Sequence, residues 1–213
     1  MKKLVALAAA LAVLISCMGA FAEADGSFWV YRDFENEDNH FNMKAMMSAE
    51  GFEDMVFLMN ESYGDHPYSG NTCIRCGVNT RQGTWGGWMF LTGIMIPGQE
   101  YLAFNDGSTP DQGEDLTGMK ELRFWARGQN GGEEVEFICF GFGAEDSAIA
   151  YKDTAEKQRI MVQLTNDWQE YTICLPEDLD LSNITLGFGY ACSSDLAEVK
   201  ENVFYLDDIR YVP

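Results

Sequence analysis

Basic residues are scarce in this sequence. It contains 14 Lys and Arg against 34 Asp and Glu, and its formal net charge at pH 7 is −20. A surface of this charge repels phosphate backbones and anionic headgroups, so nucleic acid and anionic lipid are excluded as partners. Strongly anionic glycans are disfavoured too, unless a local basic patch or a bridging calcium ion intervenes. Solubility outside the cell is the simplest explanation of the acidity.

Residues and motifs of the common catalytic sites are also scarce. His40 and His66 are the two histidines, and neither a Gly-x-Ser-x-Gly elbow nor a glycine-rich phosphate loop occurs. A glycosidase requires only two carboxylates about 5 to 10 Å apart, which so acidic a chain could supply. The Glu-x-Asp-x-x-Glu pattern of sandwich-fold glucanases is absent, however, and no base for a lyase can be identified. A binding protein is therefore favoured over a glycoside hydrolase or a polysaccharide lyase.

Long apolar runs are absent after the N-terminus. There, Lys2 and Lys3 precede an apolar stretch over 4–15, and Ala20-Phe21-Ala22 fits a signal-peptidase site. The pattern predicts a signal peptide over 1–22, secretion, and a single domain over 23–213, since no linker divides the rest. The alternative is a lipoprotein signal over 1–16, in which Cys17 is lipidated and anchors the chain at the bacterial cell envelope. Membrane attachment is expected only in that case.

The remaining cysteines are odd in number. They are Cys73, Cys76, Cys139, Cys174 and Cys192, so at least one stays free or pairs between chains. Cys73 and Cys76 lie three apart on an expected strand and should point to opposite faces, which makes a zinc site a weak interpretation. Cys76, Cys139 and Cys192 share the apolar phase of their strands and are expected to be buried thiols. One or two disulfides remain open, and the sequence does not choose them.

The clearest structural pattern spans 116–142. Apolar residues alternate with polar or exposed ones over 122–127 and again over 134–139, which is the period of a β-strand. The glycine-rich segment 128–132 between them predicts a hairpin. Further strands are expected over 28–34, 69–79, 84–93, 160–164, 168–175, 184–191 and 203–212.

Little helix is expected. In the least regular stretch, 40–61, Met43, Met46, Met47 and Phe52 could line one side of a short helix, which would be a packing surface. Residues 97–113 and 144–157 are expected to be polar loops. Many short strands separated by turn signals predict an all-β fold, a two-sheet antiparallel β-sandwich.

Three segments, in order, resemble a known family. They are DLTGMKELRFWARGQNGGEEVEF, LTNDWQEYTICL and FYLDDIRY, and the likeness runs from about Asp33 to the C-terminus. Together they resemble the secreted bacterial carbohydrate-binding modules with a galactose-binding-like β-sandwich, or jelly roll. The chain departs from that family over 40–61, where such domains carry a tighter segment containing Gly and Trp. The resemblance implies a fold, whereas function has to be argued from the site.

Aromatic and planar polar side chains could hold a sugar, because an aromatic ring packs on the C–H face and planar groups bond the hydroxyls. The expected platforms are Trp85, Trp88, Trp125 and Tyr151, and the expected rim partners are Arg123, Arg127, Glu136 and Gln163. Arg123, Trp125 and Arg127 should share one sheet surface. The alternatives are that Trp88 and Trp125 serve the core or a sheet edge, and that Arg123 pairs with Glu136 across the hairpin. Trp168 is expected to be structural.

The resemblance also implies a structural calcium ion (Ca2+). In such domains it lies between the first strand, the start of the second and the Asp-Asp of the last, which here match Asp33 or Glu35 and Asp207. Backbone carbonyls near 69–71 would complete the oxygen shell. The alternative is that the residues over 33–38 form a solvated acidic loop. Neither acidic cluster has the spacing of an EF-hand.

The sequence therefore predicts a secreted, non-catalytic protein that binds a poly- or oligosaccharide on an aromatic-lined sheet face. Envelope components or enzymes are its expected partners, because a weak lone module gains from avidity. The alternative from another class is a structural or protein-interaction β-sandwich of the cell envelope.

Overall fold

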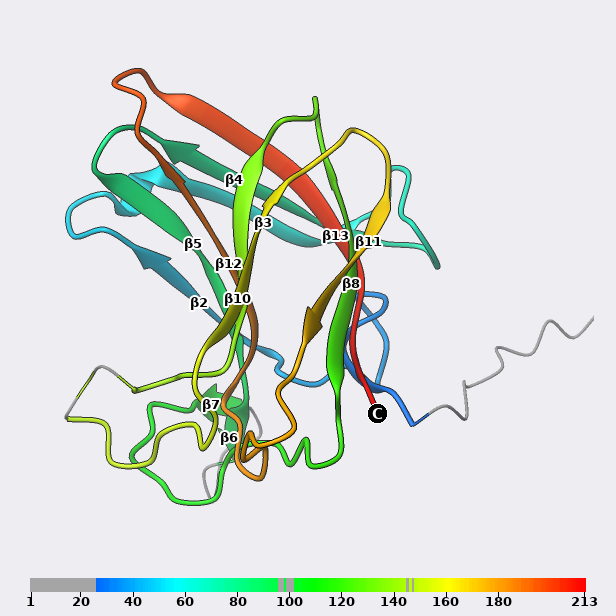
Figure 1. Ribbon diagram of the computed structural model, residues 1–213, viewed down its shortest axis with the longest axis vertical. Helices are drawn as coiled ribbons and strands as arrows, with labels where there is room; N and C mark the ends of the chain where they lie inside the picture. The colour runs from blue at the N-terminus through cyan, green and yellow to red at the C-terminus, as the bar shows by residue number, and fades with distance from the viewer. Residues whose placement is uncertain (1–25, 96–97, 99–101, 145, 147) are drawn as a thin grey trace, which may run out of the picture.

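The fold consists of two antiparallel sheets packed face to face (Figure 1). The computed structural model describes residues 26–95, 98, 102–144, 146 and 148–213. Sheet A contains, in spatial order, β11 (Gln169–Cys174), β8 (Glu121–Gly128), β13 (Lys200–Val212), β4 (Cys73–Thr80) and β3 (Val56–Tyr63), with β1 (Phe28–Tyr31) paired to β13. Sheet B contains β10 (Gln158–Gln163), β9 (Glu134–Cys139), β12 (Leu186–Ser194), β5 (Thr84–Leu91) and β2 (Met43–Ser48). The predicted two-sheet antiparallel sandwich is confirmed.

Two short elements lie outside these sheets. The strands β6 (Gly93–Met95) and β7 (Leu102–Phe104) form a separate ribbon, and the 3-10 helix η1 (Glu53–Met55) precedes β3. No helix within the described residues is long and apolar enough to cross a membrane. The predicted signal peptide over 1–22 and the alternative lipidation of Cys17 lie outside the described residues and stay predictions.

The core lies between the sheets and is rich in phenylalanine. Leu122, Phe124 and Ala126 of β8 are all 0% exposed, so the predicted apolar face of this strand is confirmed. Across the interface, the rings of Phe124 and Phe137 have centroids 4.5 Å apart, and Phe188 lies 5.4 Å from Phe124. Burying each such ring contributes roughly 2–3 kcal/mol to stability. Contacts of this kind hold sheet A against sheet B.

The predicted hairpin over 116–142 is wrong. Strand β8 pairs with β11 and β13 in sheet A, whereas β9 pairs with β10 and β12 in sheet B. The segment between them crosses from one sheet to the other, so both strands turn their apolar faces to the same core from opposite sides. Alternation defines the faces of a strand but not its partner. The expected pair of Arg123 with Glu136 is therefore wrong as well.

The short helix expected over 40–61 is also wrong. Residues 43–48 form β2, the edge strand of sheet B, which pairs with β5. Met43, Ala45 and Met47 pack against a cluster that contains Leu91, and their i, i+2, i+4 spacing is that of one face of a strand. Phe52 precedes η1 instead of lining a helix. Strand β7 likewise lies within the stretch 97–113 that was expected to be a loop.

The five cysteines within the described residues are free thiols. Cys73, Cys76, Cys139 and Cys192 are buried, and Cys174 is exposed. Cys76 lies in the main core, whereas Cys73 packs with Val203 and Tyr205 in a separate cluster, which confirms that the two thiols point to opposite faces. Burial raises the pKa of Cys73 to about 12, so this thiol is uncharged at neutral pH.

The connection from β9 to β10 is fastened by one buried carboxylate. Asp153 accepts hydrogen bonds from the backbone N–H groups of Phe142, Thr185 and Leu186, at 3.0, 2.6 and 3.3 Å. Its own N–H donates to the carbonyl of Phe142 at 3.1 Å. These bonds hold the start of the connection against the segment that leads into β12. Burial raises the pKa of Asp153 from 3.8 to about 6, against the effect of the three N–H donors.

We expect the Asp153→Asn variant to lose part of the pH dependence of stability. A carboxyl with a raised pKa in the folded state binds its proton more tightly there, so the free energy of unfolding rises as pH falls from about 7 to about 4. The contribution of Asp153 is at most about 3 kcal/mol. Urea unfolding at pH 4.5, 5.5, 6.5 and 7.5 measures it, and the variant should give the flatter curve.

Asp146→Asn is the matched control, because Asp146 lies in the same connection with an exposed side chain. Its curve should run parallel to that of the wild type. Parallel curves for Asp153→Asn and the wild type would contradict the raised pKa of Asp153 in the folded protein.

Candidate functional site

The outer face of sheet B carries a trough whose floor is β12. The residues of β12 that point away from the core are Gly189, Ala191 and Ser193, while Phe188, Tyr190 and Cys192 belong to the core. Because these outward side chains are small, the larger side chains of the neighbouring strands project beyond them on both sides. We call this depression the sheet B trough.

The flanks of the trough come from the strands on either side of β12. Register places Trp85 of β5 beside Ser193, Met89 beside Gly189, and Glu136 of β9 beside Ala191. The outward residues of the flank made by β5 and β2 include Trp85, Met89 and Met47. Those of the flank made by β9 and β10 include Glu136, Ile138, Arg159 and Met161. One flank is thus aromatic and apolar, and the other carries both charges.

Gly87 keeps the middle of the trough low. It lies opposite Ala191 in the ladder between β5 and β12. A Cβ atom at Gly87 would collide with the carbonyl oxygen of Tyr190, so only glycine fits there. The close approach of the two backbones leaves no side chain between Trp85 and Met89 on β5.

One half of the trough is open. A cavity of about 270 Å³ lies there, and its lining includes Trp85, Glu136, Met161, Ala191 and Ser193. Trp85 is 42% exposed and Met161 is 64% exposed, so an aromatic ring and a thioether face solvent on opposite flanks. The ring face of Trp85 is the kind of surface on which the C–H groups of a sugar can pack.

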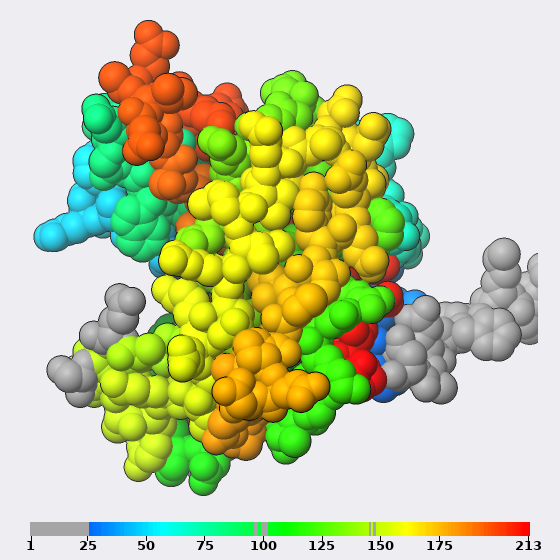
Figure 2. Space-filling view, in the orientation of Figure 1, coloured from blue at the N-terminus to red at the C-terminus, as the bar shows by residue number. Residues whose placement is uncertain are grey.

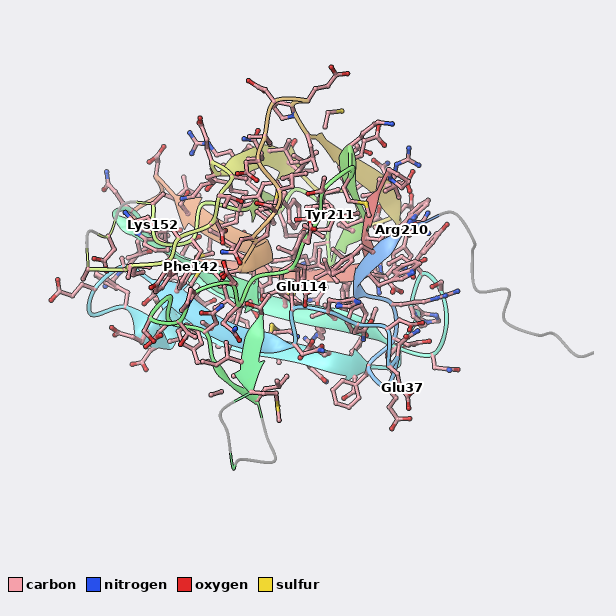
Figure 3. The ribbon with its side chains drawn as sticks, turned by 90° about the horizontal axis from the view of Figure 1, so that it is seen from below. Glu37, Glu114, Phe142, Lys152, Arg210 and Tyr211 are labelled. Carbon is pink, nitrogen blue, oxygen red and sulfur yellow. The ribbon has the colours of Figure 1, made fainter. Side chains whose placement is uncertain are left out.

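The other half of the trough is bounded by a wall. A cavity of about 530 Å³ has Met47, Met89, Ile138 and Leu186 on its floor and Phe142, Ala144, Asp146 and Ile149 on its wall. The wall belongs to the connection between β9 and β10, which bulges at the lower left of the molecule in Figure 2. Figure 3 shows Phe142 and Lys152 of this connection on one side of that end of the sandwich, with Glu37 and Arg210 on the opposite side.

An ion pair stands on the charged flank. Arg159 Nη1 donates to Glu136 Oε1 at 2.9 Å, and the Arg159 side chain is 67% exposed. An exposed pair of this kind adds roughly 0–1 kcal/mol to stability. The pair also presents guanidinium donors and carboxylate acceptors side by side. It lies diagonally across the β12 floor from Trp85, because Glu136 is opposite Ala191 and Trp85 is opposite Ser193.

The structure divides the candidate sugar-binding residues among four places. Trp85 and Glu136 lie in the sheet B trough, and Gln163 lies on the same face beside Glu134. Trp88 lies on the opposite face of β5, where it packs against the main core. Tyr151 lies on the β9–β10 connection, in a separate cavity of about 550 Å³ that Asn183 also lines.

The fourth place is the outer face of sheet A, which Arg123, Trp125 and Arg127 share as predicted. Tyr68 stacks on Trp125 there, with ring centroids 3.7 Å apart and an interplanar angle of 12°. The stacking covers the ring face that a sugar would need. Arg123 is engaged by Glu121, with Nη2 2.6 Å from Oε2.

Aromatic rings also enclose Arg127. Its guanidinium carbon lies 3.9 Å from the ring centroid of Tyr205 and 5.2 Å from that of Trp168. The Nε1–H group of Trp168 donates to the carbonyl of His66 at 3.1 Å, which agrees with the structural role expected for this residue. Around Trp125 and Arg127, the outer face of sheet A is therefore covered by its own side chains.

Several residues of the trough escaped the sequence analysis. They are Met47, Met89, Phe142, Ile149, Arg159 and Met161. The signal that could have found Arg159 and Met161 is the alternation over 158–163, where they oppose the core residues Ile160 and Val162. Phe142 and Ile149 lie in irregular backbone, so no periodic pattern marks them.

The predicted calcium ligands lie where the first and last strands meet the segment 68–72. Asp33 Oδ1 accepts from the backbone N–H groups of Asn71 and Thr72, at 2.9 and 2.8 Å. Asp207 Oδ2 accepts from those of Tyr68 and Ser69, at 2.8 and 3.2 Å. The predicted oxygen shell would need carbonyl groups of this segment, whereas N–H donors face both carboxylates.

Glu35 shares a cavity of about 380 Å³ with Asp33, but Asp207 is not part of its lining. Within the described residues, no group of three His, Cys, Asp or Glu side chains could hold a metal ion. Burial, together with the neighbouring Asp208, raises the pKa of Asp207 from 3.8 to about 7. The residues as arranged do not fit the six to eight oxygens that calcium takes, and calcium stays a prediction.

Comparisons with known proteins bear on the fold. No protein-family model matches the sequence, and no curated protein matches it. Among solved structures, the family 11 carbohydrate-binding module of the cellulosomal cellulase Lic26A-Cel5E of Clostridium thermocellum is similar, with a TM-score of 0.56 and 13% identity over 89% of this chain and 95% of that one.

Two further solved structures are similar to this chain. The family 11 module from Clostridium thermocellum in complex with a β-1,3-1,4-mixed-linked tetrasaccharide gives a TM-score of 0.54 at 14% identity, over 84% of this chain and 92% of that one. The family 30 module of the cellulase Cel9D-Cel44B of Clostridium thermocellum gives 0.51 at 17% identity, over 87% and 96%. At these identities the likeness establishes the fold alone. The chain has the β-sandwich fold of these carbohydrate-binding modules.

Proposed function

We propose that this protein is a secreted, non-catalytic carbohydrate-binding module that holds a poly- or oligosaccharide in the sheet B trough. The observation that carries the proposal is the arrangement of the open half, where the exposed Trp85 on one flank lies diagonally across the β12 floor from Glu136, which is paired with Arg159. Support comes from the fold, since a module of the same fold was solved with a mixed-linked tetrasaccharide.

The trough offers both kinds of contact that a sugar requires. A pyranose ring can lie on the low floor, with its C–H face against Trp85 and its hydroxyls toward Glu136 and Arg159. Covering the Trp85 ring contributes roughly 2 kcal/mol, and each hydrogen bond to a charged group contributes roughly 1.5–3 kcal/mol. After the cost of ordering the ligand and the side chains, the dissociation constant falls in the micromolar to millimolar range.

The open half has one carboxylate among its described lining residues, which supports binding without hydrolysis. A glycosidase places a second carboxylate about 5 to 10 Å from the first. Of the described residues that line the open half, Glu136 is the only acid, and Arg159 holds it as a hydrogen-bond acceptor. This arrangement can position a hydroxyl group but has no partner acid to protonate a leaving group.

A weak lone module is most useful when many copies act together. Export by the signal peptide over 1–22 would release the protein outside the cell, and lipidation of Cys17 would display it on the envelope instead. Either way, assembly with envelope components or with enzymes would multiply a weak affinity by avidity.

A second candidate function is protein binding, which the methionines of the trough favour. Met47, Met89 and Met161 line it, and methionine is common on surfaces that adapt to varied peptide partners. The interaction domain of this alternative would use the same face, with an apolar peptide in place of the sugar. The polar Glu136–Arg159 flank favours the sugar.

We expect Trp85→Ala to weaken glycan binding by at least about tenfold, because it removes the exposed ring that packs on the sugar. Isothermal titration of the mature chain against soluble glucans, xylans, mannans and pectins measures the affinity. The matched control is Trp125→Ala, which removes a tryptophan covered by Tyr68 on the other sheet. It should lower the melting temperature and leave the affinity unchanged.

Two results would contradict the proposal. Loss of binding in Trp125→Ala with normal binding in Trp85→Ala would move the site to sheet A. Absence of binding to every glycan of the panel, with an unchanged melting temperature, would favour the protein-interaction alternative.

The calcium prediction has its own test. Since peptide N–H groups already satisfy Asp33 and Asp207, we expect the same melting temperature in EDTA and in millimolar CaCl2. Differential scanning calorimetry checks this. A clear rise with calcium that Asp33→Asn abolishes would establish the ion and would require the segment 68–72 to turn its carbonyls inward.

A further inference from the structure

We infer that the sheet B trough binds the end of a glycan chain and not its middle, an inference that rests on the proposed function. The trough is open beside Trp85 and Ser193 and is blocked at its other end by the β9–β10 connection. A chain that enters along the floor past Trp85 therefore stops at the wall.

The direction of the trough follows from the strand register. Along β5, Trp85, Met89 and Leu91 lie successively farther from the open end. Both cavities lie between the β5 flank and the β9–β10 flank, and β12 residues contribute to the floor of each. The floor of the trough therefore runs along β12, from Ser193 toward Leu186. Trp85 to Met89 spans four residues, or roughly 13 Å.

The wall rests on the sheet. Phe142 packs against the outer cluster of Leu91, Ile138 and Leu186, which are the residues at the far end of the trough. The chain turns outward just before it, since Phe140 and Gly141 have φ values of 64° and 80°. This turn ends β9 and sends the connection over the face of the sheet instead of along it.

The wall is braced from behind. A Cβ atom at Gly107 would lie 2.5 Å from Cγ2 of Ile149 and 3.5 Å from Cε1 of Phe142, so the segment after β7 is in tight contact with the connection. The Asp153 carboxylate, which bonds the N–H groups of Phe142 and Leu186, ties the wall to the floor. A ligand would have to break these contacts to pass.

The groups at the blocked end suit a chain terminus. Asp146, Lys157 and Arg159 line the cavity beside the apolar floor of Met89 and Ile138. An internal sugar residue has both of its glycosidic positions substituted and would have to continue through Phe142. A terminal residue has a free hydroxyl at one of these positions, which carboxylate and ammonium groups can bond.

The test compares chains of different lengths. The probe is β-1,3-1,4-mixed-linked glucan cut into narrow size fractions, with its tetrasaccharide as the shortest member. If this glucan does not bind, it is replaced by a glycan of the panel that does bind. Isothermal titration gives the number of protein molecules bound per chain. We expect this number to stay constant as the chains lengthen, and the tetrasaccharide to bind as tightly as the long fractions. A number that grows in proportion to chain length, with Trp85→Ala still weakening binding, would overturn the inference and leave the proposed function intact.

Labelling one end of the glycan gives a second test, which requires no mutation of the protein. The tetrasaccharide is labelled with a bulky fluorophore at its reducing end in one preparation and at its non-reducing end in another. The label at the end that meets the wall should abolish binding, and the other label should be tolerated. Tolerance of both labels would overturn the inference, whereas absence of binding by every unlabelled glycan would overturn the proposed function and the inference together.

A variant tests the wall itself. Phe142→Ala should weaken tetrasaccharide binding by about tenfold, because it removes apolar surface from the blocked end. Phe57→Ala is the matched control, since Phe57 is an exposed phenylalanine on β3 of the other sheet. Unchanged affinity in Phe142→Ala, at an unchanged melting temperature, would show that the wall does not touch the ligand and would overturn the inference.

Discussion

The contact between the inner faces of the two sheets is the constraint on which the rest of the molecule depends. Phenylalanines from both sheets meet there, with Phe124 and Phe204 of sheet A against Phe137 and Phe188 of sheet B. Because side chains alternate along a strand, committing one set of residues to this core commits the intervening set to the outside. The character of each outer face is therefore decided by what lies between the core residues.

The two outer faces differ in how they meet solvent. On sheet A, aromatic rings and Arg127 stack on one another and cover the strands. On sheet B, the central strand carries Gly189 and Ala191, so the face has a low middle that no side chain of its own fills. Its apolar flanks and one ion pair remain free to meet another molecule. An exposed depression of this kind on a stable sandwich is where a binding function is best sought.

The sequence predicts the layers of this fold better than the pairing of its strands. The alternation in β8 and β9 predicts their core faces correctly, because burial of one face leaves a period of two. It could not show that β8 and β9 belong to different sheets, since two strands that turn apolar faces to one core look alike in either arrangement. The methionines of β2 fit a helix pattern as well as a strand pattern, because Met43, Met46 and Met47 are three or four residues apart.

The site was only partly accessible to sequence reasoning. Trp85 and Glu136 were identified by residue type, and both line the trough. Trp88 and Trp125 have the same chemistry but point to the core and to a closed face, which depends on strand phase and on Tyr68. The wall could not be foreseen, because Phe142 is positioned by Asp153 from a distant part of the connection and no local pattern records such a contact.

The position of β13 bears on how the protein reaches its folded state. This strand, over 200–212, lies between β8 and β4 and also pairs with β1. Sheet A therefore has no continuous hydrogen-bonded centre until residue 212 has left the ribosome, and most of its pairing joins residues far apart in the chain. Such topologies fold slowly, because long loops must close before their contacts form. The last strand to be synthesised is therefore the one that completes sheet A, and this half of the sandwich forms late in folding.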